Sequence, residues 1–112
     1  MQSDDLQQRI VELENRLKEV ETRVQQGEIE SAYVFIHSNW GLIRWYLTRE
    51  QDLHGEGSDT YNRARNAEMT LRDNLSRNLR AVQFDSRPME VAQRWRVETT
   101  VTLNRNGYTF FD

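Results

Sequence analysis

The residues that could carry out catalysis are few in this chain of 112 residues. There is no cysteine, so thiol chemistry and disulfide bonds are excluded, and the two histidines are His37 and His54. Patterns that place a nucleophile or a zinc ion, such as Gly-x-Ser-x-Gly or His-Glu-x-x-His, do not occur. His37 lies in an apolar segment, where a structural role is the simpler interpretation. We therefore expect no catalytic residue, no cofactor and no enzymatic activity.

One short segment gathers side chains that could hold an ion. The segment from His54 to Asp59 contains three possible oxygen or nitrogen ligands and two glycines. These ligands could bind a metal, and the start of a following helix could bind a phosphate. A dinucleotide fingerprint would need a third glycine where Thr60 stands. A polar connecting loop explains the segment more simply, so we expect no metal site, although the sequence leaves ion binding by this loop open.

Two segments, Arg44 to Tyr46 and Arg94 to Arg96, interleave arginine with aromatic residues. If such side chains were exposed on one face of a sheet, they could stack on unpaired bases. Alternation along a strand would instead place the tryptophans of both segments in the core. The net charge of −3 gives general nucleic-acid binding little support. An oligomeric nucleic-acid-binding regulator is therefore the alternative function and not the leading one.

The sequence also bears on location. No apolar run approaches the roughly 20 residues that span a bilayer. The first residues, Met1 to Asp5, lack the basic and then apolar signature of a signal peptide. We expect no membrane association and a cytoplasmic protein, or one inside a viral particle if it is a virion component.

The strongest pattern lies near the start of the chain. Apolar residues recur there at spacings of 4, 3, 4, 3 and 4, which is the heptad repeat of a coiled coil. Positions d are Leu6, Leu13 and Val20, and positions a are Ile10, Leu17 and Val24. A helix that packs on its own domain can carry the same apolar stripe. The charges that flank the stripe are therefore the evidence that separates internal packing from self-association.

The charges beside the stripe favour parallel self-association. Arg9, Arg16 and Arg23 occupy positions g, and Glu14, Glu21 and Glu28 occupy positions e. Between parallel helices each arginine faces the next glutamate of the neighbour, whereas antiparallel copies would oppose like charges. Each exposed pair adds about 0.2–1 kcal/mol, so the pairs select the orientation more than they stabilise the assembly.

Two stretches of this segment, 9–14 and 16–21, resemble the Arg-apolar-x-x-apolar-Glu motif of short parallel trimeric coiled coils. Residues 23–28 repeat the motif with Gly27 at its second apolar position. The resemblance implies a homotrimer, although dimers and tetramers also contain the motif, and it names no protein family. Gly27 is expected to end the helix. The chain therefore divides into a coiled-coil oligomerisation arm, residues 1–27, and a body, residues 28–112.

The body is expected to start with a β-hairpin. Residues 32–37 and 42–48 are rich in β-branched and aromatic residues, and a Ser-Asn-Trp-Gly turn separates them. A helical interpretation competes, because six apolar residues also follow heptad spacing. These are Ile29, Tyr33, Ile36, Trp40, Ile43 and Leu47. Strands are preferred because Tyr-Val-Phe-Ile has a low helix propensity and Gly41 interrupts the segment.

The rest of the body is expected to add one helix and two strands. Residues 59–82 have a helical period, with Ser58 or Asp59 as the N-cap. Residues 91–103 alternate apolar and polar side chains, which is typical of a strand, and a turn at 104–107 leads to a last strand at 108–111. The predicted fold class is α+β, a coiled-coil helix followed by a small ββαββ domain with an antiparallel sheet.

The function that fits these features is that of a structural or adaptor protein. The arm would gather the copies, a trimer being favoured, and the bodies would display repeated surfaces to a protein partner. By analogy, small trimeric components of virus or phage particles have this architecture. Trp40 is the candidate partner-binding residue. A large aromatic side chain at a hairpin tip is either an anchor for a partner or is packed against its own sheet or a neighbouring subunit.

Overall fold

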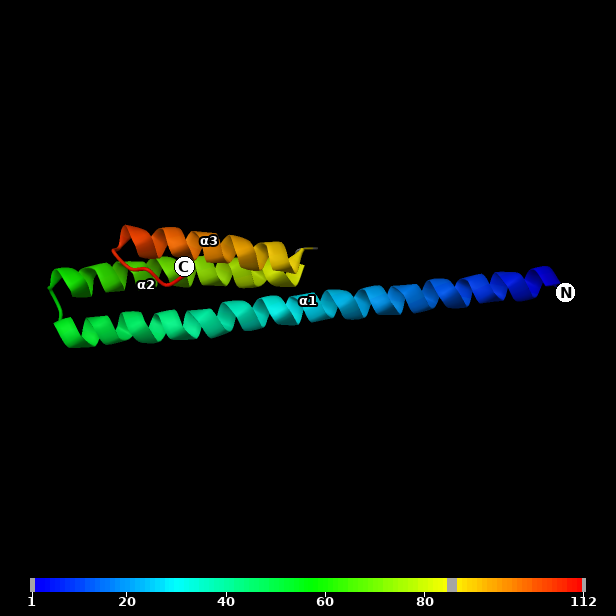
Figure 1. Ribbon diagram of the computed structural model, residues 1–112, viewed down its shortest axis with the longest axis horizontal. Helices are drawn as coiled ribbons and strands as arrows, with labels where there is room; N and C mark the ends of the chain where they lie inside the picture. Colours follow the sequence, from blue (N-terminus) through cyan, green and yellow to red (C-terminus); the bar gives the residue numbers. More distant parts are fainter. Residues whose placement is uncertain (1, 85–86, 112) are drawn as a thin grey trace.

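The computed structural model describes residues 2–84 and 87–111; residues 1 and 112, at the ends of the two predicted domains, lie outside it, as do 85 and 86. The described chain forms three α-helices: α1 spans Gln2–His54, α2 spans Asp59–Phe84 and α3 spans Pro88–Arg105 (Figure 1). Helices α2 and α3 lie beside the second half of α1, and each pair of helices is in contact. The first half of α1 extends beyond them, so the longest dimension of the molecule is 82 Å.

The α+β prediction was wrong, because the described residues contain no strand or sheet. Residues 32–48 belong to α1 and residues 91–103 belong to α3. Gly27 does not end a helix either, since α1 runs through it without a break. A glycine in a helix costs only about 1 kcal/mol relative to alanine. The glutamines and glutamate around Gly27 are good helix formers, so that cost is too small to stop the helix.

The second half of α1 provides one side of the core. Its buried stripe follows a helical period and contains Ala32, Ile36, Ile43 and Leu47, each at most 2% exposed. Trp40 lies on the same stripe at 9% exposure, in the cluster that contains buried residues of α2 and α3. The helical interpretation of residues 29–47 therefore holds in place of the hairpin.

Helix α2 is the helix expected over residues 59–82. Gly55 and Gly57 have positive φ angles of 72° and 91°, which allow the chain to reverse between α1 and α2. The Ser58 hydroxyl then accepts a hydrogen bond of 3.1 Å from the Tyr61 N–H, as an N-cap does. The buried face of the helix contains Ala64, Ala67, Leu71, Asn78 and Val82.

Helix α3 begins at Pro88 and buries a stripe of its own. Its buried residues are Pro88, Val91, Ala92, Trp95, Thr99 and Leu103. Gly107, with φ +86°, turns the chain, and the Tyr108 N–H donates to the Leu103 carbonyl at 2.8 Å. The predicted turn at 104–107 is thus the end of a helix and not a hairpin.

The last described residues form a tail that packs on the bundle and are not a strand. The Phe111 ring stacks on Phe35 of α1 at 6.3 Å and meets Trp95 of α3 edge-on at 6.1 Å. The Tyr108 ring meets Tyr46 edge-on at 5.8 Å. The tail therefore closes the side of the bundle where α1 and α3 meet.

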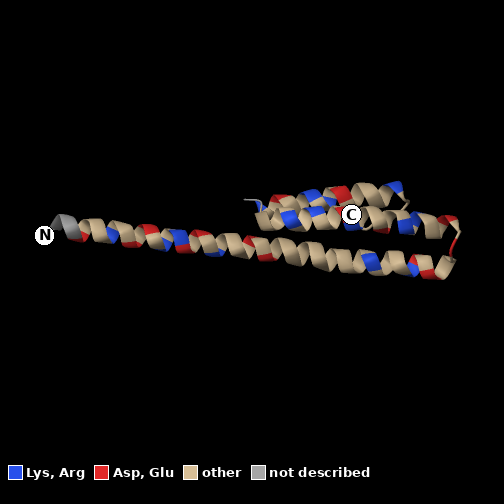
Figure 2. Cartoon of the chain, turned by 180° about the vertical axis from the view of Figure 1, so that it is seen from behind, with Lys and Arg blue, Asp and Glu red and all other residues tan. Residues whose placement is uncertain are grey.

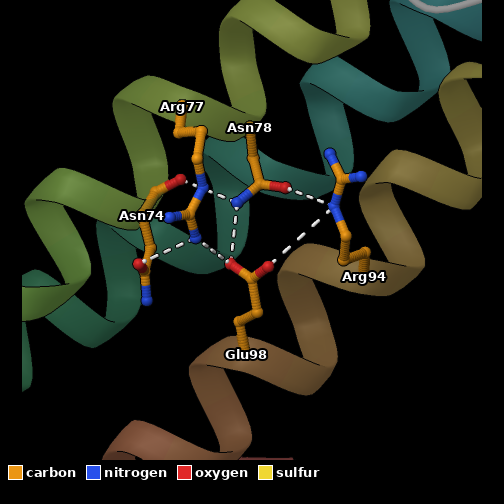
Figure 3. Close-up of polar contacts among 5 residues, drawn as sticks. All are labelled: Asn74, Arg77, Asn78, Arg94 and Glu98. Atoms are coloured by element: carbon orange, nitrogen blue, oxygen red, sulfur yellow. Dashed lines mark hydrogen bonds and ion pairs between the residues drawn. The ribbon is translucent and has the colours of Figure 1, made fainter.

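A polar network joins α2 to α3 (Figure 3). The Glu98 carboxylate of α3 accepts from the Arg77 guanidinium at 2.8 Å and from the Asn78 amide at 3.1 Å. Asn78 is fully buried, and its amide nitrogen also donates to the Asn74 carbonyl at 2.7 Å. Arg94 completes the network at 3.9 Å from Glu98. Because a buried amide needs its partners, this network specifies how the two helices align.

Candidate self-association surface

The arm is a helix that no other part of the described chain covers. Every residue from 5 to 28 is exposed, and the first residue of α1 that packs against the core cluster is Ile29. The six apolar residues at positions a and d are each 48–62% exposed. They are Leu6, Ile10, Leu13, Leu17, Val20 and Val24. A stripe of this regularity without a covering partner is unusual on a single chain, since soluble proteins rarely expose contiguous apolar surface.

Among the described residues, the charged residues at positions g and e beside this stripe are also without ion-pair partners. In the part of the chain that the structure describes, Arg9, Arg16 and Arg23 make no ion pair, and neither do Glu14, Glu21 and Glu28. Figure 2 shows basic and acidic residues interspersed along the arm. Both partners of every predicted g-to-e pair are therefore available to a neighbouring helix.

The arrangement on the arm is suited to the formation of a coiled coil. The apolar stripe would supply the buried seam, and the arginine stems would cover its edges while their guanidinium groups reach carboxylates. In proteins most of the stability of a helix comes from the packing of its apolar face, and the arm has no such packing within the described chain. Burial against a second copy would provide the stabilisation that the rest of the chain does not supply.

Trp40 lies elsewhere than the sequence predicted. It is in the middle of α1 and belongs to the core cluster, so there is no hairpin tip from which it could protrude. Packing inside the body explains this tryptophan, and the reason for assigning it to a partner no longer applies. The heptad spacing of residues 29–47 carried the signal for this burial.

The two histidines do not come together. His37 is exposed on α1 and stacks on Tyr33 at 6.0 Å, while His54 lies 3.3 Å from the Glu50 carboxylate at the end of the same helix. In residues 2–84 and 87–111 there is no group of three or more histidine, aspartate or glutamate side chains that could hold a metal. The loop after His54 serves as the turn into α2.

The two arginine–aromatic segments differ in exposure. Trp95 is 1% exposed in the core, whereas Trp45 is 61% exposed on α1, with the Arg49 guanidinium 5.4 Å from its ring. A sheet that would present both tryptophans to bases is absent from the described chain. Exposed Trp45 is a feature that the sequence did not predict, because a strand would have buried it.

An open apolar cavity of about 380 Å³ lies between α1 and the tail. Leu42, Trp45 and Tyr46 line one side, and Tyr108 and Phe110 line the other. Burial raises the pKa of both tyrosines, and the nearby Glu50 carboxylate adds to the rise because it disfavours the phenolates. The lining offers mainly apolar contact, and its polar side chains are those of the two tyrosines and Thr109.

None of the described helices has an apolar stretch long enough to cross a membrane. Comparisons with models of protein families, with curated protein sequences and with solved structures found no match.

Proposed function

We propose that this protein is a non-enzymatic structural or adaptor protein that assembles through its arm into a parallel homo-oligomer, with a trimer favoured. The helical body would then be displayed in several copies to a protein partner. Such display suits a component of a larger assembly, either in the cytoplasm or in a particle such as a virus or phage. Repeated display raises avidity without any new contact surface.

The observation that carries the proposal is the uncovered arm. Its apolar a and d residues are exposed over six successive positions, although burying one such side chain fully is worth about 1.5–3 kcal/mol. Its flanking charges are arranged for parallel neighbours and have no partners within the described chain. Both features are accounted for by one occupant, a second copy of the arm.

Light scattering on the full chain tests the proposal. The molecule is elongated, so a mass measurement is preferable to a retention volume. We expect three times the 13.4 kDa of one chain. Leu13→Asp, which places a charge in the middle of the stripe, should reduce the mass to that of a smaller species.

Asn15→Asp is the matched control, because it adds the same charge at position f, on the far side of the arm helix. It should leave the mass unchanged. A wild-type protein that is monomeric at micromolar concentration would overturn the proposal, and a mass of two chains would overturn the stoichiometry alone. Equal effects of the two variants would show that the loss of assembly is not specific to the stripe.

A further inference from the structure

The second half of α1 has an exposed face opposite the face that packs on α2 and α3. Residues nine apart lie on opposite sides of a helix, because nine residues are two and a half turns of about 3.6 residues each. Trp45 is nine residues from Ile36, and Val34 is nine residues from Ile43. Both isoleucines are buried, whereas Val34 is 64% exposed and Trp45 is 61% exposed. Neither α2 nor α3 covers this face, and the tail approaches it only at the open cavity that Trp45 lines.

This face continues the heptad of the arm without a change of register. Counting on in sevens from Val20 and Val24, the next a and d positions all fall on exposed residues. They are Gly27, Ser31, Val34, Ser38, Gly41 and Trp45, and we refer to this set as the α1 seam. The core-facing residues of the same helix follow a different register, so the α1 seam and the packing of the body do not compete for side chains.

Large and small residues are interspersed along the α1 seam in a way that suits a helix–helix interface. Gly27 and Ser31 precede Val34, and Ser38 and Gly41 precede Trp45, so two small layers precede each large layer. The two glycines stand inside a helix, and a Cβ at either would meet nothing within 4 Å. No close approach within the chain therefore requires them, while a second helix along this face would lie against both.

We propose that the interface between copies of this chain extends beyond the arm along the α1 seam, so that parallel α1 helices form the central stalk and α2 and α3 pack on its outside. The inference rests on the self-association proposed above and names its extent and its occupant, which is α1 of a second copy. The seam ends near Trp45, because the next g-to-e pair of parallel helices would oppose Arg44 to Arg49.

The absence of cysteine allows a direct test with single cysteine substitutions in the full chain. Ser38→Cys places a thiol in the α1 seam, and Val24→Cys places one in the arm. Ser76→Cys is the matched control, an exposed serine on the outer side of α2. With diamide as the oxidant, two thiols lose two electrons and two protons and form a disulfide only where the Cα atoms of two copies come within about 7 Å.

We expect Ser38→Cys to cross-link between copies as fully as Val24→Cys and roughly tenfold or more faster than Ser76→Cys, measured on non-reducing gels. Cross-linking at residue 24 without cross-linking at residue 38 would overturn the seam and leave the assembly by the arm intact. Failure at both residues would overturn the assembly and the seam together. A Ser76→Cys rate equal to that of Ser38→Cys would show random collision and would also overturn the seam.

Discussion

Thr99 has a side-chain hydroxyl that makes no hydrogen bond in the folded protein. The residue is fully buried in α3, and its hydroxyl has no hydrogen-bond partner. A buried polar group without a partner costs about 1–3 kcal/mol. Thr99→Val replaces the hydroxyl with a methyl of similar size, so we expect the free energy of unfolding to rise by about 1 kcal/mol. Chemical denaturation at a fixed chain concentration measures this change.

Thr100→Val is the control for the same substitution in the same helix. The Thr100 hydroxyl donates to the Arg96 carbonyl at 2.8 Å, so its removal relieves no unpaired group. We expect no gain in stability from this variant. A gain of the same size in both variants would assign the effect to valine itself and would contradict the role given to the Thr99 hydroxyl.

Glu98 is the residue on which the α2–α3 network depends. Glu98→Ala removes the acceptor shared by Arg77 and by the buried amide of Asn78. Leaving that amide short of a partner should lower the free energy of unfolding by about 1–3 kcal/mol. Glu90→Ala is the control in the same helix, because its ion pair with Arg87 is solvent-exposed and such pairs contribute at most about 1 kcal/mol. Thermal melting of both variants compares them, and equal losses would contradict the bridging role of Glu98.

At the scale of the elements, α3 shows why the strand prediction failed. Its buried residues Val91, Trp95, Thr99 and Leu103 are spaced by four, and a spacing of four lies on one face both in a helix and in a strand. A helix and a strand differ in where they place the residues halfway between these buried ones, such as Val97 and Val101. In a strand these valines would share the buried face, whereas in α3 they are 54% and 43% exposed. Because these two residues are apolar and β-branched, residues 91–103 matched the alternating pattern of a strand without a gap.

Residues 29–47 show a different limit of sequence interpretation. Their 4-3-4-3-4 spacing matches the helix that is present, and local propensity argued for strands. Propensity differences are a few tenths of a kcal/mol per residue, while burying one isoleucine is worth about 1.5–3 kcal/mol. The apolar period therefore outweighs the composition. The helix at 59–82 could be predicted because its apolar period and its N-cap residue both indicate a helix.

We expect the bundle to lose stability at alkaline pH, because of Tyr108 in the tail and Tyr46 in α1. Burial raises the pKa of Tyr108 and of Tyr46, so the folded state binds these protons more tightly than the unfolded chain does. The resulting stability is fully present below the unfolded pKa of about 10 and is lost as the pH rises through the higher folded pKa. We expect the melting temperature to fall above pH ~10, and a variant with both tyrosines changed to phenylalanine to lose this fall. An unchanged alkaline fall would contradict the assignment.

At the scale of the whole molecule, the arm residues lie on an exposed helix, as their heptad spacing predicts. The continuation of their register could not be predicted once a helix end was placed at Gly27. It becomes visible only because α1 is continuous for 53 residues and because α2 and α3 define which face is occupied. One face of α1 thus packs on α2 and α3, and the opposite face, which continues the register of the arm, is exposed.

The charges beside the arm stripe provide a test of orientation. Changing Arg9, Arg16 and Arg23 together to Glu would oppose acidic residues at all three charged g-to-e pairs of the arm in a parallel assembly. Changing Glu14, Glu21 and Glu28 together to Arg would oppose basic ones. Each variant alone should assemble more weakly, by a few kcal/mol at most for exposed pairs, and the loss should shrink in high salt. Melting at fixed concentration measures both, and full assembly of either variant would contradict parallel pairing.

A mixture of these two charge variants also reports the number of chains. In a ring of chains each g row faces the e row of the next chain, so an acidic variant pairs well only with a basic neighbour. Two chains can alternate completely, but three cannot, because one of the three contacts must join two chains of the same variant. We therefore expect mixing to restore stability only in part, with one contact in three still repulsive. Complete restoration of the wild-type melting temperature would instead indicate an even number of chains.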